Sequence, residues 1–262
     1  MTALHPDAVS VDEIRRHTTA LVDVARRTPL DTPVPTCGHW NLGDLIHHLF
    51  EVQNFWLHII GRRPAGPDTY TEPTRPADGD LVDTLERVND ELLGELAAAD
   101  RTDTAWSWAD EQTVGFTVRR QTHEALVHSI DGLLAAGLPL PEVSAELGAD
   151  GVDELFGVML SVPPDTEGYE ADGPVIELHA TDSDDRWRYG FGRLPRAGSD
   201  GATTMVNALQ AAPDDEPAAT VAADGLTLTL WLWKRADRRA VSITGDDAAV
   251  ERLEALVSEV TG

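Results

Sequence analysis

The spacing of apolar residues changes once along the chain, near residue 162, and this change restricts the possible folds more than any other feature. Before it, apolar residues recur every three or four positions, as they do on one face of an α-helix. After it, runs such as 175–180 and 186–191 alternate apolar and polar residues, as half-buried β-strands do. The sequence therefore predicts an all-α domain over residues 1–161, a linker over 162–174 and a smaller α+β domain over 175–262.

Four helices are expected to form a bundle in the first domain, and a fifth is expected to cover it. The first begins after Ser10, because Ser10 and Glu13 form a capping-box pattern. The other four are expected at about 41–61, 79–100, 117–136 and 141–160. Residues 61–79 are rich in proline and glycine, which predicts a long loop. Residues 31–37, with two further prolines, are expected to form an extended connector.

The second domain shows fewer but distinct signals. The runs 175–180 and 186–191 flank an Asp-rich turn, which indicates a β-hairpin. A further strand is expected at 240–244 and a closing amphipathic helix at 246–260. Residues 226–233 fit two structures, because their alternation favours a strand whereas Asp224 can cap a helix at this point.

The charge balance limits the classes of partner. The chain has 46 Asp and Glu against 20 Lys and Arg, a formal net charge of −26. Such a surface repels nucleic-acid phosphates and anionic membranes. The single cysteine, Cys37, excludes an intramolecular disulfide and any multi-cysteine metal site. No signal-peptide pattern or membrane-spanning apolar run is present, so we expect a soluble cytoplasmic monomer or homodimer.

A metal site is suggested by Glu124 and His128, which are four residues apart and share one face of a helix. A third ligand must come from elsewhere, and the best candidate is His48, on the apolar stripe of the second helix. Two histidines and one carboxylate leave a coordination position open, as in catalytic zinc sites. A satisfied core histidine and a solvated Glu–His pair explain the same residues without a metal.

Helical geometry separates the neighbouring histidines. His123 and His128 are five residues apart, about 140° around the helix, so they do not readily chelate one ion. His47 and His48 point about 100° apart, and His47 lies closer to the polar side. Asp131 follows His128 by three residues and can accept its second ring N–H, although a solvated aspartate fits the position equally well.

At these residues the chain resembles the mycothiol-dependent maleylpyruvate isomerase family. The likeness is carried by Val34-Pro-Thr-Cys-Gly-His-Trp40 with Asp44-Leu-Ile-His-His-Leu49, by His123-Glu-Ala-Leu-Val-His128 followed by Asp131, and by Trp231-Leu-Trp-Lys-Arg235 followed by Ile243-Thr-Gly-Asp246. The resemblance implies a DinB-like four-helix bundle followed by a small α/β sandwich-like domain, and it favours a helix at 226–233. It also implies that His48, Glu124 and His128 are zinc ligands.

The resemblance further implies a thiol-dependent reaction with mycothiol as cosubstrate. A thiolate on zinc can add reversibly to a cis double bond, which isomerises it, or can transfer its sulfur to another electrophile. Arg235 is then the expected catalytic residue, holding a substrate carboxylate, and Arg235 and Lys234 are expected to bind the cosubstrate, with Arg193 a further candidate. The family usually has Pro-Gly where this chain has Gly38-His39, so the substrate stays open.

Two other functions use the same three ligands. A zinc-dependent hydrolase would activate water at the open position and consume no thiol. A non-catalytic zinc-binding protein would use the metal structurally and bind a partner through its acidic surface. Structural zinc sites are usually closed by four protein ligands, and the sequence offers no convincing fourth, so this function ranks last.

Overall fold

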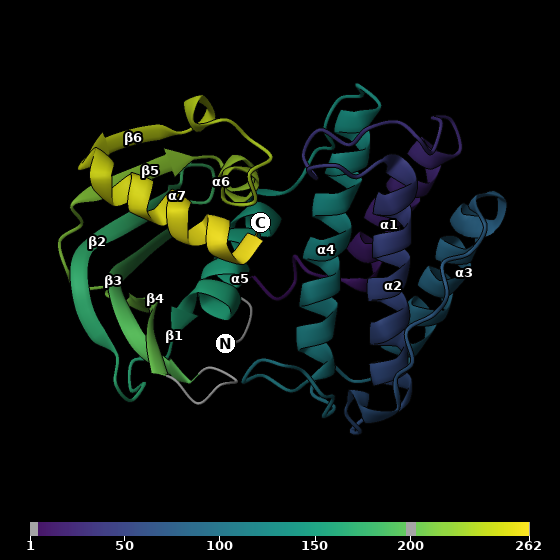
Figure 1. Ribbon diagram of the computed structural model, residues 1–262, viewed down its shortest axis with the longest axis horizontal. Coiled ribbons are helices and arrows are strands. Elements are labelled where there is room, and N and C mark those ends of the chain that lie inside the picture. Colours follow the sequence, from purple (N-terminus) through teal and green to yellow (C-terminus); the bar gives the residue numbers. More distant parts are fainter. Residues whose placement is uncertain (1–4, 198–202, 262) are drawn as a thin grey trace. The chain divides into compact units, whose positions relative to one another are not determined.

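The computed structural model describes residues 5–197 and 203–261 and consists of two compact units. The first unit runs from Pro6 to Glu142, and the second begins at Val143 and also includes His5 (Figure 1). The first is helical, and the second combines helices with a mixed β-sheet. This order of classes along the chain agrees with the predicted one.

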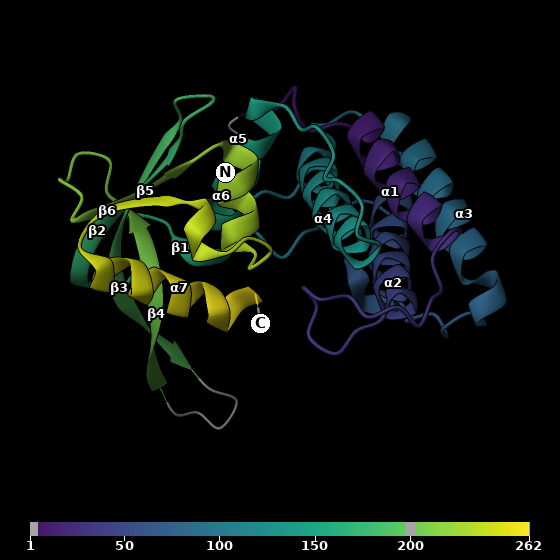
Figure 2. The ribbon, with the colours of Figure 1, turned by 90° about the horizontal axis from the view of Figure 1, so that it is seen from above.

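Four long helices make up the first unit. They are α1 (Val11–Ala25), α2 (Leu42–Gly61), α3 (Asp78–Ala97) and α4 (Val114–Ala135). Helices α1 and α2 each contact both α3 and α4, and Figure 2 shows the four side by side. All four lie within a few residues of the expected ranges. The predicted long loop between α2 and α3 contains one short 3-10 helix, η1 (Pro67–Thr69).

Side-chain caps determine where the two helices of the predicted metal site begin. At the start of α2, the Asn41 side chain accepts from the Asp44 N–H and the Asp44 side chain accepts from the Asn41 N–H, which completes a capping box. At the start of α4, the Thr113 hydroxyl accepts from the Phe116 N–H. Buried Leu45 and Leu49 of α2 then face the apolar core shared by α1, α2 and α3. These constraints set which way the other side chains of α2 and α4 point.

The second unit contains a six-stranded mixed sheet in the order β1-β4-β3-β2-β5-β6. The strands are β1 (Ser161–Val162), β2 (Glu170–Ala180), β3 (Arg186–Ala197), β4 (Thr203–Ala211), β5 (Ala219–Ala223) and β6 (Ser242–Gly245). Strands β2 and β3 pair antiparallel as the predicted hairpin, and β6 lies where a further strand was predicted, near 240–244. Strands β4 and β5 were not expected, because neither sequence alternates strictly between apolar and polar residues.

The remaining helices cover the apolar side of this sheet. They are α5 (Ala145–Glu154), continued by the π-helical turn η2 (Leu155–Leu160), then α6 (Gly225–Leu232) and α7 (Asp247–Thr261), with the short 3-10 turn η3 (Arg238–Ala240) between α6 and β6. One apolar cluster joins α5, η2, α6 and α7 to four strands, and α7 lies across the sheet in Figure 1. The ambiguous segment 226–233 is helical, because the Asp224 carboxylate accepts the Thr227 N–H and caps α6.

The domain boundary differs from the expected one. We expected the helix at 141–160 to cover the helical bundle and the first domain to end at 161. Instead, α5 packs against α6 and shares the core of the second unit, so the division falls between Glu142 and Val143. The segment 162–174, expected as a linker, contains the end of β1 and the start of β2. Residues 1–4, 198–202 and 262 of the predicted domains lie outside the described residues.

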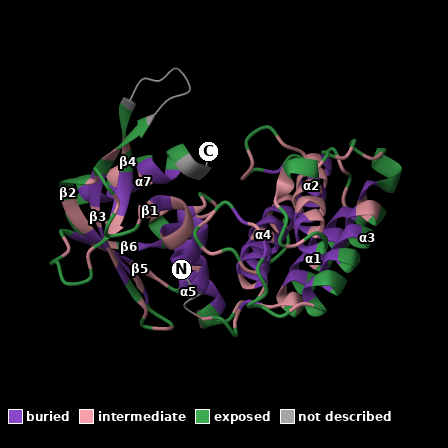
Figure 3. Cartoon of the chain, turned by 90° about the horizontal axis from the view of Figure 1, so that it is seen from below, coloured by how far each residue is buried: buried purple, intermediate pink, exposed green. Residues whose placement is uncertain are grey.

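Burial follows the amphipathic patterns of the helices. In Figure 3, α1 and α3 each show one exposed and one buried side, as their apolar spacing predicts. Within the two described ranges, no helix has the length and apolar character needed to cross a membrane.

The crossing of α5 and α6 requires glycine. A Cβ atom added to Gly148 would lie 2.5 Å from the backbone nitrogen of Leu226. A backbone atom cannot move away as the end of a flexible side chain could. We expect Gly148→Ala to lower the free energy of unfolding by about 1–3 kcal/mol, measured by chemical denaturation. The control is Gly94→Ala on α3, where a new Cβ meets open space, and it should stabilise by roughly 0.5–1 kcal/mol. An unchanged denaturation midpoint for Gly148→Ala would contradict this packing.

Candidate metal centre

The structure brings together the side chains of His48 on α2 and of Glu124 and His128 on α4. The Nε2 atoms of both histidines lie 3.2 Å from the same carboxylate oxygen, Glu124 Oε1. One potential ligand atom from each residue lies within 4.8 Å of the others. The two imidazole rings meet edge to face, with centroids 4.9 Å apart. The predicted triad therefore forms a single cluster of donor atoms between two helices.

These distances suit a small divalent cation. Ligand atoms about 2.1 Å from a tetrahedral ion lie roughly 3.4 Å from one another. The two separations of 3.2 Å are close to this value, and they equally suit hydrogen bonds between the imidazoles and the carboxylate. Neutral imidazoles and a carboxylate are the donors that Zn²⁺ accepts in catalytic sites. The residues present therefore fit such an ion in both distance and chemistry.

The second oxygen of Glu124 is held by Arg120. Arg120 Nη2 donates to Glu124 Oε2 over 3.0 Å, one turn earlier on α4. Burial on its own would raise the pKa of Glu124, but hydrogen bonds from His128 and His48 and the nearby charges of His128 and Arg120 hold it well below its usual range. Glu124 is therefore a carboxylate at neutral pH, and Arg120 leaves Oε1 directed toward the histidines.

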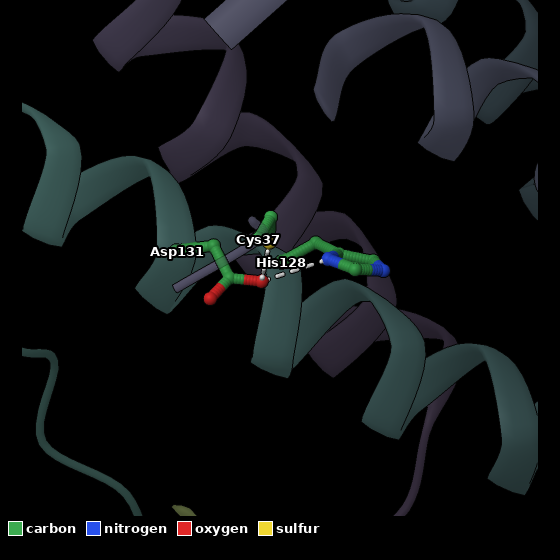
Figure 4. A group of neighbouring side chains, drawn as sticks. All are labelled: Cys37, His128 and Asp131. Carbon is green, nitrogen blue, oxygen red and sulfur yellow. Dashed lines mark hydrogen bonds and ion pairs between the residues drawn. The ribbon is translucent and has the colours of Figure 1, made fainter. Parts of the chain in front are cut away.

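On the other side of its ring, His128 is held by Asp131. His128 Nδ1 lies 3.0 Å from Asp131 Oδ2, as the spacing of three residues suggested. Thr36 donates to Asp131 Oδ1 over 2.5 Å, and the Cys37 thiol donates to Oδ2 over 3.3 Å. Figure 4 shows Cys37, His128 and Asp131 close together at α4. This arrangement positions the ring and aims Nε2 at Glu124.

Cys37, His128 and Asp131 form a second cluster of potential metal ligands, which shares His128 with the first. The two clusters lie on opposite sides of the His128 imidazole. Nδ1 faces Asp131 in one cluster, and Nε2 faces Glu124 in the other. The exposed fractions of the side chains differ between them. Asp131 is completely buried, whereas 33% of the His48 side chain is exposed. Each cluster has a half-buried ligand side chain that borders solvent, His48 in the first and Cys37 in the second.

Residues 33–41 support both clusters from one loop. We expected an extended connector at 31–37, but this segment folds back on itself. The Val34 N–H donates to the Trp40 carbonyl, the Cys37 N–H to the Val34 carbonyl, and the Trp40 N–H to the Cys37 carbonyl. Gly38, within this turn, adopts a φ of +63°. This turn brings Thr36 and Cys37 to Asp131 and places the Trp40 ring 5.0 Å from the His48 ring.

The other two histidines of these motifs lie apart from the cluster. His47 Nδ1 lies 3.3 Å from the Glu51 carboxylate on the same helix. His123 is completely buried and belongs to neither cluster of potential ligands in the described part of the chain. The histidines that helix geometry favours in the two pairs, His48 and His128, are therefore the ones that lie in the cluster.

The predicted cationic residues lie in the second unit, just beyond α6. Lys234 has a φ of +60°, and the backbone N–H groups of Lys234 and Arg235 donate to the carbonyls of Trp231 and Leu230, which gives a Schellman-type helix end. Arg235 Nη1 also donates to the Trp233 carbonyl over 2.7 Å. Arg193 on β3 is paired with Asp172 at 2.6 Å. A role for Arg235 and Lys234 in ligand binding stays a prediction.

Sequence comparison identifies the first unit. Residues 11–131 match the family described as the mycothiol maleylpyruvate isomerase N-terminal domain. No curated protein matches the chain. The resemblance inferred from the sequence motifs is therefore confirmed, on residues that include His48, Glu124 and His128.

Two solved structures share the fold. A crystal structure of the mycothiol-dependent maleylpyruvate isomerase aligns with a TM-score of 0.56 at 10% identity. A structure of a histidine-to-alanine mutant of that isomerase aligns with a TM-score of 0.59 at 11% identity. Each alignment covers 90% of this chain and 92% of the other chain. The similarity shows a common arrangement of helices and strands over both units.

Four supporting contacts, those of Arg120, Thr36, Cys37 and Trp40, were not anticipated from the sequence. The spacing of four residues between Arg120 and Glu124 was a usable signal, because such pairs meet on a helix. The contacts of Thr36, Cys37 and Trp40 depend on how the 33–41 loop closes, which no local pattern predicts.

The hydrogen bonds of His128 predict how stability depends on pH. Burial lowers the pKa of His128, but the hydrogen bonds and charges of Asp131 and Glu124 raise it to about 9. Because the pKa of His128 is higher in the folded than in the unfolded protein, its protonation stabilises the fold. This contribution is complete below the unfolded-state pKa of about 6.5 and is lost as the pH rises through about 9. We expect the metal-free protein to lose stability, on the order of 1–3 kcal/mol, between these two values in denaturation experiments. His128→Gln should remove this dependence of stability on pH. If the variant shows the same pH dependence as the parent protein, other groups cause it.

Proposed function

We propose that this chain is a metal-dependent enzyme that uses mycothiol as a thiol cosubstrate, with a DinB-like four-helix bundle as its metal-binding domain. The observation that carries the proposal is the convergence of His48 Nε2, His128 Nε2 and Glu124 Oε1 within the domain matched by the isomerase family. Three protein ligands leave a coordination position for a small molecule, which favours a catalytic over a structural site. Zinc is the metal we assign, because its preferred donors and geometry fit these residues.

A divalent metal at this site would supply a positive charge that keeps a bound thiol deprotonated at neutral pH. The residues of the chain prepare the site for it. Asp131 holds the His128 proton on Nδ1, so that Nε2 would offer its lone pair to a metal that displaces the second proton, while Arg120 engages one oxygen of Glu124 and leaves the other directed toward the histidines. Trp40 packs against His48 and limits its rotation.

Two reactions follow from an activated thiol, and both balance without a redox partner. In isomerisation, sulfur adds to one carbon of a cis double bond, the resulting single bond rotates, and elimination of the thiol restores a trans double bond. In S-transfer, sulfur displaces a leaving group or opens a strained ring and stays on the product. We propose that Arg235 binds a substrate carboxylate in either reaction and that Lys234 helps to bind the thiol.

The metal assignment is tested by metal analysis of purified variants. We expect about one equivalent of zinc in the parent protein and near-complete loss in His48→Ala and Glu124→Gln, because two remaining ligands bind weakly. Asp131→Asn should weaken zinc binding by about 10–100-fold, because the ring of His128 loses its negatively charged acceptor. His47→Ala is the matched control and should keep its zinc. If Cys37→Ser loses zinc while His48→Ala retains it, the metal belongs to the Cys37–His128–Asp131 cluster.

The use of a thiol is tested by turnover of an activated electrophile with and without mycothiol. Under our proposal the zinc-loaded protein reacts only when the thiol is present, and His48→Ala is inactive while folded by circular dichroism. Net thiol consumption identifies S-transfer, whereas a trans product without thiol loss identifies isomerisation. Hydrolysis without any thiol would instead support a zinc-dependent hydrolase, and retained zinc without any turnover would support a non-catalytic zinc-binding protein.

A further inference from the structure

A pocket of about 490 Å³ opens on the first unit, beside α2. Its walls come from α2 and from the two loops that follow α2 and α3, and they include Glu51, Phe55, Tyr70, Glu72 and Trp108. Neither the family match nor the metal chemistry assigns a role to this pocket. Aromatic rings and carboxylates dominate its lining.

The aromatic rings of the pocket are fixed by edge contacts. The Phe55 and Tyr70 rings meet at 89° with centroids 5.1 Å apart. The Trp108 ring meets Phe116 at 89° and 5.6 Å, yet Trp108 remains 49% exposed. An ordered but exposed indole ring offers its electron-rich face to a ligand. Such faces attract cations within about 6 Å of the ring centre.

Two carboxylates give the pocket a negative charge. Burial raises the pKa of the Tyr70 hydroxyl, the Asn54 side chain opposes this, and the charges of Glu51 and Glu72 raise it further. Both carboxylates therefore act on the same tyrosine at the pocket wall. Glu51 also contacts the His47 ring at 3.3 Å. None of the described residues that line the pocket is basic.

The pocket lies near the candidate metal centre on the same helix. Glu51 and Val52, which line the pocket, follow His48 by three and four residues on α2. These spacings place them on the His48 side of the helix, roughly 4.5 and 6 Å further along its axis. The pocket therefore begins about one helical turn from a candidate metal ligand.

We infer that this pocket is a subsite for an organic cation, a quaternary or alkylated ammonium group carried by the electrophilic substrate. The inference rests on the proposed function for the position of the reacting group. Aromatic faces and two carboxylates favour a weakly hydrated cation through cation–π and charge attraction. A carboxylate at the same place meets two like charges and no basic lining residue. The pocket therefore excludes the acidic end of a substrate, which has to be bound elsewhere.

The test uses choline as a probe and measures its binding to the zinc-loaded full-length protein by calorimetry and ligand-observed NMR. We expect choline to bind and its neutral isostere, with carbon in place of nitrogen, to bind about three- to tenfold more weakly. The double variant Glu51→Gln/Glu72→Gln and the variant Trp108→Leu should each weaken choline binding by a similar factor.

The matched control removes two carboxylates elsewhere. Glu86→Gln/Glu91→Gln on α3 changes the net charge equally, at two exposed ion pairs with Arg26 and Arg87, and it should leave choline binding unchanged. Equal binding of the neutral isostere, or equal weakening by the control, would overturn the inference.

Failure of the inference is separable from failure of the proposed function. Choline should still bind to the His48→Ala variant, because no metal ligand lines the pocket. Choline binding by a protein that takes up no zinc refutes the metal proposal and supports the cation subsite. Zinc uptake and thiol-dependent turnover without any choline binding refute the subsite alone.

Discussion

The candidate centre depends on one carboxylate oxygen, Glu124 Oε1, which lies 3.2 Å from the Nε2 atoms of both His48 and His128. This shared contact is where α2 and α4 meet through polar atoms, and a mostly buried carboxylate requires such partners to keep its charge. Two further residues hold the groups of this contact in place. Arg120 holds the second oxygen of Glu124, and Asp131 holds the far nitrogen of His128. The cluster is therefore preorganised by its surroundings, whether or not an ion occupies it.

Much of the helical unit followed from local patterns in the sequence. Ser10 caps α1 as expected, α2 begins within one residue of the expected position, and the apolar spacing of the four helices was clear. The choice of His48 and His128 over His47 and His123 needed only the helical repeat. The 33–41 loop could not be predicted, because its shape depends on backbone bonds and on its contacts with α4. Helix α5 was predicted, but its partner was not, since an apolar face does not specify which core it joins.

The two parts of the proposed active site have opposite electrostatic character. The metal centre would attract a thiolate and polarise an electrophile, whereas the pocket next to it combines aromatic rings with Glu51 and Glu72. The net charge of −26 extends the negative field over the whole molecule and works against anionic ligands that find no local cation. Together these features favour a substrate with one cationic end and leave any carboxylate to a separate basic residue. The family match over residues 11–131 thus supports the proposed chemistry of the centre, and the lining of the pocket supports the proposed selection of a cationic substrate.

The most direct test of the central claim is X-ray absorption spectroscopy at the zinc edge, before and after addition of mycothiol. We expect the resting protein to show nitrogen and oxygen ligands near 2.0–2.1 Å and no sulfur, followed by one zinc–sulfur distance of about 2.3 Å when the thiol is added. A sulfur ligand in the resting protein would place the metal at Cys37 instead. A spectrum unchanged by mycothiol would contradict direct thiol binding and with it the proposed reaction.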